Sequence, residues 1–167
     1  MPLTPCDLTS ADLDRMLVLN NAAVPKVNDL SGPALERLME WASVVSGARG
    51  EDGTLLGFVL ALPPGLPYES ENYRWVCGRR ETFLYVDRVV VASDARGRGV
   101  GRALYRTVMR AAAVHHRRDA RVICEVNERP PNPGSMAFHK ALGFRPIGRV
   151  DYGTGAKAVR FLECRHA

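Results

Sequence analysis

The sequence predicts a mixed β-sheet covered by helices, in the α+β or α/β class. Two amphipathic helical segments come first, a β-hairpin follows, and a strand, a glycine-rich turn, a helix and a second strand come next. A short helix and a terminal hairpin complete this order. Strands and helices that alternate within one chain of 167 residues fit a single domain built around one principal sheet.

Two amphipathic helices are predicted in the N-terminal half of the chain, at residues 9–20 and 31–42. Each begins with a residue whose side chain can accept a hydrogen bond from the first turn, and Ser31 is followed by Pro33, which suits that turn. Apolar side chains then recur at helical spacing. We therefore expect each helix to bury one face against the sheet.

A β-hairpin is predicted next, from two apolar runs at residues 44–49 and 55–61. The connection between them contains Asp52 and Gly53, a pair that adopts the tight turns of hairpins. The segment that follows, residues 63–78, is rich in proline and long for a simple connection. We therefore expect a long loop there that helps to shape a functional site.

The C-terminal half contains the most strand-like segment, residues 82–91, whose β-branched and aromatic side chains favour a strand. A glycine-rich turn follows it directly and opens a helix. Gly143 ends a later, shorter helix. The further elements predicted here are a helix at residues 100–116, a strand at 121–126, a helix at 135–142, and a hairpin of residues 144–152 and 156–164 around residues 153–155.

Basic residues are concentrated in the second half of the chain. Residues 1–80 hold 7 basic and 10 acidic side chains, whereas residues 81–167 hold 16 basic and 8 acidic ones, so the halves carry −3 and +8. The second half is therefore expected to bind an anion. The charge by itself fits nucleic acid, a phosphorylated cofactor or a membrane surface.

The composition argues against several classes of protein. No apolar run approaches the roughly 18 residues of a membrane span, so we expect no membrane partner. The four cysteines lie far apart without a CxxC pair, which argues against a disulfide framework or a metal site. The N-terminal residues lack the basic stretch of a signal peptide, and a cytoplasmic location is expected.

The turn of residues 94–102 has the character of an anion site. The first amide groups of a helix have no partner within it, and the helix dipole adds partial positive charge there. Glycines at positions 97, 99 and 101 let the main chain approach a phosphate, and arginines at 96, 98 and 102 add full positive charges. The spacing matches neither the dinucleotide-binding pattern nor the P-loop pattern.

What the turn does resemble is the pyrophosphate-binding loop of the GNAT superfamily of N-acetyltransferases. The matching residues are Arg96, Gly99 and Gly101, in the pattern Arg-x-x-Gly-x-Gly. As in that superfamily, the loop follows a strand with alternating apolar residues.

A second motif strengthens the resemblance. Asn132 precedes a short helix that carries the adjacent rings of Phe138 and His139, and Gly143-Phe144 follows, which is similar to the superfamily's second signature in order and spacing. The resemblance covers residues 82–149, whereas residues 1–80 match only in the order of their elements.

The resemblance implies one acetyltransferase domain over residues 1–167, with residues 1–80 on the acceptor side, 81–149 as the acetyl-CoA-binding core and 150–167 as terminal strands. It implies a central mixed, mostly antiparallel sheet with helices on both faces and a splayed strand pair that holds CoA. Acetyl-CoA would be the cosubstrate, without a metal. The implied cofactor-binding residues are Val89, Val90, Val91, Arg96, Gly97, Arg98, Gly99, Val100, Gly101, Arg102, Asn127, Asn132, Ser135 and His139.

The general acid is the assignment in which this chain departs from the family pattern. Most family members carry a tyrosine at the position of His139, where its hydroxyl faces the CoA sulfur, and this chain lacks that tyrosine. An imidazole has a suitable pKa for donating a proton to the leaving thiolate. His139 is therefore the candidate general acid, and the alternatives are Tyr152, Tyr85 or a thiolate that leaves without a proton.

The candidate base is a carboxylate near the incoming amine. Tyr85 and Asp87 precede Val89 and Val91 with the same parity, so they should point to the same side of the strand unless a bulge shifts the register. Asp87 would then lie beside the amine, and Glu125 on the facing strand is the other candidate, each acting through water. The candidate catalytic residues are His139, Glu125, Asp87 and Tyr85.

The resemblance favours an enzyme that moves an acetyl group to the primary amine of a small molecule or peptide by direct attack on the thioester. A non-catalytic CoA-binding module is the alternative, because the usual tyrosine is absent. Nucleic acid is not an expected partner, since the sequence shows no helix-turn-helix, aromatic stacking strand or zinc motif. The identity of the acceptor and the formation of a homodimer stay open.

Overall fold

A seven-stranded sheet forms the centre of the computed structural model, which describes residues 3–116, 119–153 and 155–166. The strands are β1 (Thr4–Asp7), β2 (Val44–Arg49), β3 (Leu55–Leu62), β4 (Leu84–Val91), β5 (Ala120–Arg129), β6 (Arg145–Asp151) and β7 (Ala158–His166). Their order is β1-β2-β3-β4-β5-β7-β6, and the β4–β5 pair is parallel whereas the other neighbouring pairs are antiparallel. The predicted mixed, mostly antiparallel sheet is confirmed.

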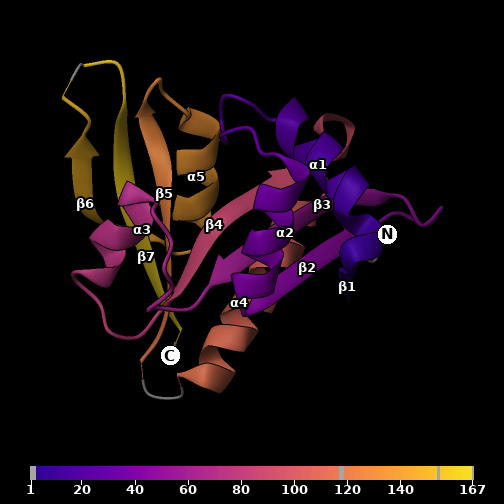
Figure 1. Cartoon of the computed structure of the whole chain (residues 1–167), viewed down its shortest axis with the longest axis horizontal. Helices are drawn as coiled ribbons and strands as arrows, with labels where there is room; N and C mark the ends of the chain where they lie inside the picture. The colour runs from indigo at the N-terminus through magenta and orange to yellow at the C-terminus, as the bar shows by residue number, and fades with distance from the viewer. Residues whose placement is uncertain (1–2, 117–118, 154, 167) are drawn as a thin grey trace.

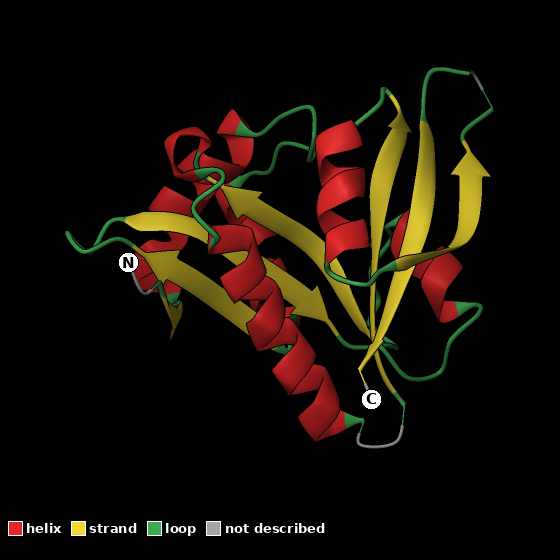
Figure 2. Cartoon of the chain, turned by 180° about the vertical axis from the view of Figure 1, so that it is seen from behind, coloured by secondary structure: helices red, strands yellow, loops and turns green. Residues whose placement is uncertain are grey.

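Helices cover both faces of the sheet, as predicted (Figures 1 and 2). One face carries α1 (Leu13–Ala22), α2 (Gly32–Trp41) and α3 (Glu71–Cys77), and the other carries α4 (Val100–His115) and α5 (Pro133–Ala141). The view from behind in Figure 2 brings α4 and α5 in front of the strands. Short 3₁₀ turns precede α1 at Ser10–Asp12 and α4 at Ser93–Ala95.

Each face of the sheet has its own hydrophobic core. Along β3, Phe58 and Leu60 belong to the core beneath α1, α2 and α3, whereas Val59 and Ala61 belong to the core beneath α4. Every residue of β3 is buried, because both faces of this strand are covered. This double coverage explains why the strand reads as a continuous apolar run in the sequence.

Capping side chains begin the helices where the sequence predicts. The Ser31 hydroxyl accepts a hydrogen bond from the amide of Ala34 at 3.3 Å, with Pro33 in the first turn of α2. The Asn132 side chain accepts one from the amide of Ser135 at 3.2 Å and begins α5. These local bonds set where α2 and α5 start, and so which side chains α5 turns inward.

A bulge in β4 makes one prediction from strand parity wrong. The register of β4 against β3 skips a single residue, Asp87. Tyr85 therefore belongs to the core beneath α1, α2 and α3, whereas Val89 and Val91 contact the core beneath α4. Tyr85 does not share a side of the strand with Val89 and Val91, because the extra residue reverses the alternation.

The parallel pair β4–β5 is joined near the beginning of β4. Its register consists of Leu84↔Val122 and Tyr85↔Ile123, although β4 continues to Val91. Beyond these pairs the two ribbons run apart in Figure 1. Among the described residues, the main chain at positions 89–91 pairs with β3 and not with β5, so its edge toward β5 can bind another group.

The structure contains two elements that the sequence interpretation missed, β1 and α3. Residues 71–77 are helical, so the prediction of a loop across 63–78 is wrong there. Signals for this helix are present in the sequence: Ser70 caps its first turn, Gly78 ends it, and Tyr73 and Val76 are buried at helical spacing. The prolines that precede Ser70 masked these signals. β1 has four residues and no alternating pattern.

The ends of several elements differ from the predicted ones. β5 continues through residues 127–129, beyond its predicted end at residue 126, because β7 pairs with it up to Arg129. The hairpins β2–β3 and β6–β7 form as predicted, and Thr154 of the second turn lies outside the described residues. Within the described ranges, each helix is too short or too polar to cross a membrane.

Candidate active site

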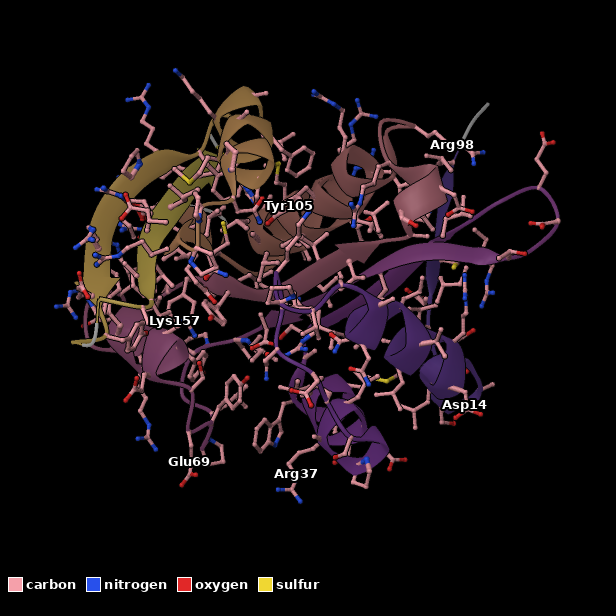
Figure 3. All side chains as sticks on the ribbon, turned by 90° about the horizontal axis from the view of Figure 1, so that it is seen from above. Asp14, Arg37, Glu69, Arg98, Tyr105 and Lys157 are labelled. Carbon is pink, nitrogen blue, oxygen red and sulfur yellow. The ribbon has the colours of Figure 1, made fainter. Side chains whose placement is uncertain are left out.

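A cleft of about 1290 Å³ brings together almost all of the residues that the sequence singles out. It is lined by β4, β5, the turn of residues 95–102, α4 and α5, and at its other end by the loop of residues 23–29 and the start of α3. Arg98 is the predicted site residue that does not line it. Figure 3 shows Arg98 at the periphery of the molecule and Tyr105 in its interior.

The glycine turn runs along one end of the cleft. Gly97 and Gly99 have φ angles of 74° and 84°, a left-handed conformation that other residues rarely adopt. Gly99 is the N-cap of α4 and has no side chain that could bond the first amides of the helix. These amides and the helix dipole favour an anion here, and exposed Arg96 and Arg102 line the same end.

Gly101 has a different reason to be glycine. A Cβ at this position would lie 3.0 Å from Cζ of Phe138 on α5, tighter than most Cβ contacts, whereas a Cβ on Gly97 or Gly99 would meet no atom within 4 Å. The third glycine of the motif therefore lets α5 pack closely against α4. That packing joins the two sequence motifs into one site.

His139 of α5 is buried, with 3% of its surface exposed, and both ring nitrogens are engaged. Nδ1 lies 2.7 Å from the main-chain oxygen of Ser135, and Nε2 lies 2.6 Å from the hydroxyl of Tyr105 on α4. A carbonyl oxygen only accepts, so Nδ1 carries the proton and donates it to Ser135. Nε2 of the neutral ring then accepts from Tyr105.

The burial of His139 favours its neutral state. Burial lowers the pKa of His139, against an opposing hydrogen bond to Ser135. The rings of Tyr105, Phe138 and Phe144 surround it at centroid distances of 5.2 Å, 5.2 Å and 5.3 Å. The single proton of the imidazole is directed at a main-chain oxygen rather than at the cleft.

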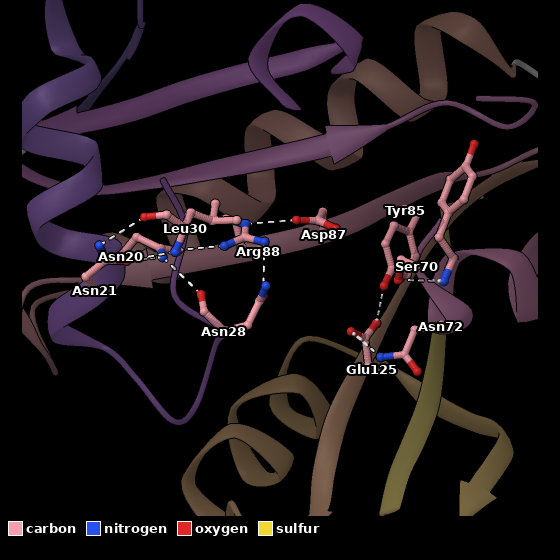
Figure 4. Close-up of polar contacts among 11 residues, drawn as sticks. Asn20, Asn21, Asn28, Leu30, Ser70, Asn72, Tyr85, Asp87, Arg88 and Glu125 are labelled. Atoms are coloured by element: carbon pink, nitrogen blue, oxygen red, sulfur yellow. Dashed lines mark hydrogen bonds and ion pairs between the residues drawn. The ribbon is translucent and has the colours of Figure 1, made fainter. Parts of the chain in front are cut away.

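Glu125 of β5 lies at the opposite end of the cleft, where two donors hold it (Figure 4). The Tyr85 hydroxyl donates to Oε2 at 2.7 Å, and Nδ2 of Asn72 donates to Oε1 at 3.0 Å. Burial raises the pKa of Glu125 to about 7, although both hydrogen bonds act in the opposite direction. The carboxylate is therefore poised to exchange a proton near neutral pH.

Asp87, the other candidate base, is engaged by a buried arginine. Nε of Arg88 donates to Oδ2 of Asp87 at 2.8 Å, and the two side chains are 1% and 4% exposed. Arg88 also donates to Oδ1 of Asn20 at 2.7 Å and of Asn28 at 3.3 Å. Arg88 therefore fastens the end of α1 and the 23–29 loop to β4, as Figure 4 shows, and one oxygen of Asp87 is engaged by the same guanidinium.

Several residues of the cleft were not found from the sequence. Tyr105 follows Gly101 by one helical turn, so its place on the face of the glycine turn could have been inferred from spacing. Asn72 and Tyr68 line the cleft from the segment that was predicted, as a whole, to be a long loop shaping a functional site. Their roles depend on contacts with β4 and β5 that no local pattern encodes.

In the part of the chain that the structure describes, no three His, Cys, Asp or Glu side chains form a group that could hold a metal ion.

A family model described as "Acetyltransferase (GNAT) family" matches residues 19–144. A search of curated proteins returns no significant match.

Several solved structures have the same fold. A GNAT superfamily phosphinothricin acetyltransferase from Sinorhizobium meliloti, in complex with AcCoA, matches with a TM-score of 0.71 and 20% identity over 99% of this chain and 89% of its own. Arabidopsis thaliana NAA60, in complex with acetyl-CoA, matches with a TM-score of 0.75 and 18% identity over 98% of both chains. A ribosomal-protein-alanine N-acetyltransferase from Brucella melitensis gives a TM-score of 0.69 and 22% identity over 98% and 100%.

Proposed function

Because the chain belongs to the GNAT family of acetyltransferases, we propose that it transfers the acetyl group of acetyl-CoA to the amine of a small molecule or peptide. The observation that carries this proposal is a single cleft with an anion-binding turn at one end and a carboxylate poised near neutral pH at the other. One similar protein is named for a small-molecule acceptor, phosphinothricin, and another for an alanine of a ribosomal protein. The proposal therefore includes both kinds of acceptor.

The residues at the first end fit the diphosphate of acetyl-CoA. The open amides that begin α4 and the side chains of Arg96 and Arg102 would hold it. The unpaired edge of β4 at residues 89–91 would receive the pantetheine chain as an added strand. Asn127, Asn132 and Ser135 line the same cleft and supply polar groups along the path.

Acetyl-CoA would supply a thioester carbonyl that an uncharged amine attacks directly. An amine arrives in water as an ammonium ion, so a base must first remove a proton. Glu125 has the position and the pKa, about 7, to take that proton directly or through a water molecule. The Tyr85 hydroxyl holds one oxygen of Glu125 and is a positioning group in this proposal.

The leaving thiolate would depart without a proton from the candidate acids. His139 donates its proton to the Ser135 carbonyl, the Tyr85 hydroxyl donates to Glu125, and the Tyr152 hydroxyl donates to Asn72. Each donor is already committed to a neighbour. Among the alternatives that the sequence left open, the hydrogen bonds favour the unaided thiolate.

Thiol release from acetyl-CoA in the presence of a panel of amines tests the proposal. The panel should include polyamines, amino acids, aminoglycosides and short peptides with free N-termini. Turnover with at least one class is expected, and Glu125→Gln should lower kcat/KM by about 10²–10⁴-fold. Glu128→Gln is the matched control, because Glu128 lies on the same strand and pairs with Arg160 and Arg149 instead.

Tight binding of CoA without turnover across the panel would favour the non-catalytic module instead. If kcat/KM falls equally in Glu125→Gln and Glu128→Gln, Glu125 is not the base. The proposal that the protein transfers an acetyl group would still stand.

A further inference from the structure

A chain of hydrogen bonds leads from the β6–β7 turn to Glu125. The Tyr152 hydroxyl donates to Oδ1 of Asn72, and Nδ2 of Asn72 donates to Oε1 of Glu125 at 3.0 Å. Tyr152 follows the end of β6, and Asn72 lies in the first turn of α3. Two elements at the acceptor end of the cleft therefore meet at the carboxylate.

Glu125 and Tyr152 together fix the orientation of the Asn72 amide. An amide can present either an oxygen or an NH₂ group, and its orientation follows from its partners. The ionised Glu125 carboxylate only accepts, so Nδ2 of Asn72 faces it, and Oδ1 is left to accept from the Tyr152 hydroxyl. Without that hydroxyl, Oδ1 of Asn72 loses its donor, and the amide is held less firmly in the orientation that donates to Glu125.

The hydrogen bond from Asn72 favours the ionised form of Glu125, against burial and a neighbouring charge that favour the protonated form. Burial and the negative charge of Asp87 raise the pKa of Glu125, whereas donors from Tyr85 and Asn72 lower it. Glu125 in turn raises the pKa of several neighbours. Titratable and charged groups from each neighbouring element line the cleft together with Glu125: Tyr85, Asp87 and Arg88 from β4, Tyr68 from the preceding loop, Tyr105 from α4, Cys124 from β5, Glu71 from α3, and Tyr152 and Lys157 from the β6–β7 turn.

We propose that Asn72 and Tyr152 are positioning residues that keep Glu125 ionised and aimed into the acceptor end of the cleft. The role of this carboxylate as the base rests on the proposed function, whereas its coupling to Asn72 and Tyr152 can be measured without any acceptor. Since α3 and the β6–β7 turn both line the cleft, an acceptor that moves either element would change the proton affinity of Glu125.

Carbon-13 NMR of the protein labelled at the glutamate side-chain carboxyl measures this coupling directly. The resonance of Glu125 is identified by its loss in Glu125→Gln, and its titration midpoint in the unmodified protein is expected near pH 7. Asn72→Leu keeps a side chain of similar size without the donor and should raise the midpoint by about one pH unit. Tyr152→Phe removes one oxygen and should raise it by a smaller amount.

Ser70→Ala is the matched control for a general disturbance of α3. Its hydroxyl accepts from the amide of Tyr73 at 3.3 Å and caps the helix without a bond to Glu125, so the midpoint should stay within about 0.2 units of the starting value. An unchanged or lower midpoint in folded Asn72→Leu, or equal shifts in Ser70→Ala and Tyr152→Phe, would overturn the proposal.

The pH profile of kcat/KM, with the best amine of the panel, links the coupling to turnover. The acidic limb should move upward in Asn72→Leu by the same amount as the NMR midpoint, because the limb reports the base of the free enzyme. A moved NMR midpoint with an unmoved limb would leave the positioning role intact but exclude Glu125 as the base, so the two failures are distinguishable.

Discussion

The hydroxyl of Tyr105 lies 2.6 Å from Nε2 of His139, and both side chains are buried between α4 and α5. The pair joins the helix that follows the glycine turn to the helix of the second motif. Burial favours the neutral imidazole, and because Nδ1 donates to Ser135, Nε2 of that neutral ring accepts the proton of Tyr105. The position that the resemblance gives to a general acid is therefore occupied here by an acceptor.

This relationship predicts a pH-dependent stability. Burial lowers the pKa of His139 below the value of about 6.5 of an unfolded chain, so the folded state binds fewer protons below that pH. The stability is fully present above pH 6.5 and is lost as the pH falls through the folded pKa. Tm should therefore fall between pH 7 and pH 5, with a flatter decline in His139→Gln.

Calorimetry of the unmodified protein and of two histidine variants checks this prediction. His115→Gln, at the exposed end of α4, is the control and should follow the unmodified protein. A decline that is as steep in His139→Gln as in the unmodified protein would mean that other groups cause it.

A second pH effect, of opposite sign, is predicted for Glu125. Its pKa of about 7 in the folded state exceeds the ordinary value of 4.5, so ionisation of Glu125 destabilises the fold increasingly as the pH rises from 4.5 through 7. Glu125→Gln removes this cost, and each pKa unit corresponds to about 1.4 kcal/mol. The variant should therefore gain several degrees in Tm relative to the unmodified protein at pH 8, with a smaller gain at pH 5.

The comparison with Glu128→Gln makes this measurement specific. A hydrogen bond from Arg160, which outweighs partial burial, lowers the pKa of Glu128. Its ionised form is therefore favoured by folding, and Glu128→Gln should lower Tm at pH 8. A rise in both variants would contradict the assignment of the gain to the buried environment of Glu125.

The features of the site that could be predicted are the glycine turn and the helix starts, because they depend on residues close together in the sequence. Gly99 caps a helix in a left-handed conformation and Asn132 caps the next one, and each feature is recognisable within a few residues. The resemblance of the turn of residues 94–102 to the GNAT loop then predicted which end of the cleft would bind the cofactor. The same locality explains why the mixed sheet and both C-terminal helices were anticipated.

The rest of the site depends on contacts between distant segments. Asn72 reaches Glu125 across 53 positions, and Tyr105 reaches His139 across 34, so neither bond has a signature in any window of the sequence. The bulge at Asp87 is equally invisible, because the strand keeps its β-branched residues on both sides of it. One skipped residue was enough to reverse the predicted direction of Tyr85 relative to Val89.

The arginines of α4 should differ in their effect on acetyl-CoA. Arg102 lines the cleft in the first turn, whereas Arg110 lies two turns further along the same helix, and both are exposed. Arg102→Ala should raise the KM for acetyl-CoA by about tenfold, since a bond to a charged phosphate is lost. Arg110→Ala should leave it nearly unchanged.

Steady-state kinetics at two salt concentrations distinguish a direct contact between Arg102 and acetyl-CoA from a general electrostatic attraction by the positively charged surface. The effect of Arg102→Ala should shrink at high salt, because screening weakens the interaction that the arginine contributes. Equal increases of KM in both variants would assign the attraction to the net charge of the surface instead.

Gly148 of β6 is predicted to be essential for the packing of α3. Trp75 of α3 stacks on Phe161 with ring centroids 3.9 Å apart and planes 7° apart. A Cβ on Gly148 would lie 2.3 Å from Cζ2 of Trp75, so the indole must move. Gly148→Ala should therefore destabilise the fold by about 1–3 kcal/mol through overpacking, and each kcal/mol corresponds to roughly 2–4 °C in Tm.

Gly32→Ala in the first turn of α2, where a Cβ meets no atom within 4 Å, is the control and should keep or raise Tm. Tryptophan fluorescence should shift in Gly148→Ala alone, and an unchanged spectrum and Tm would mean that the indole has room to move away from β6 without loss.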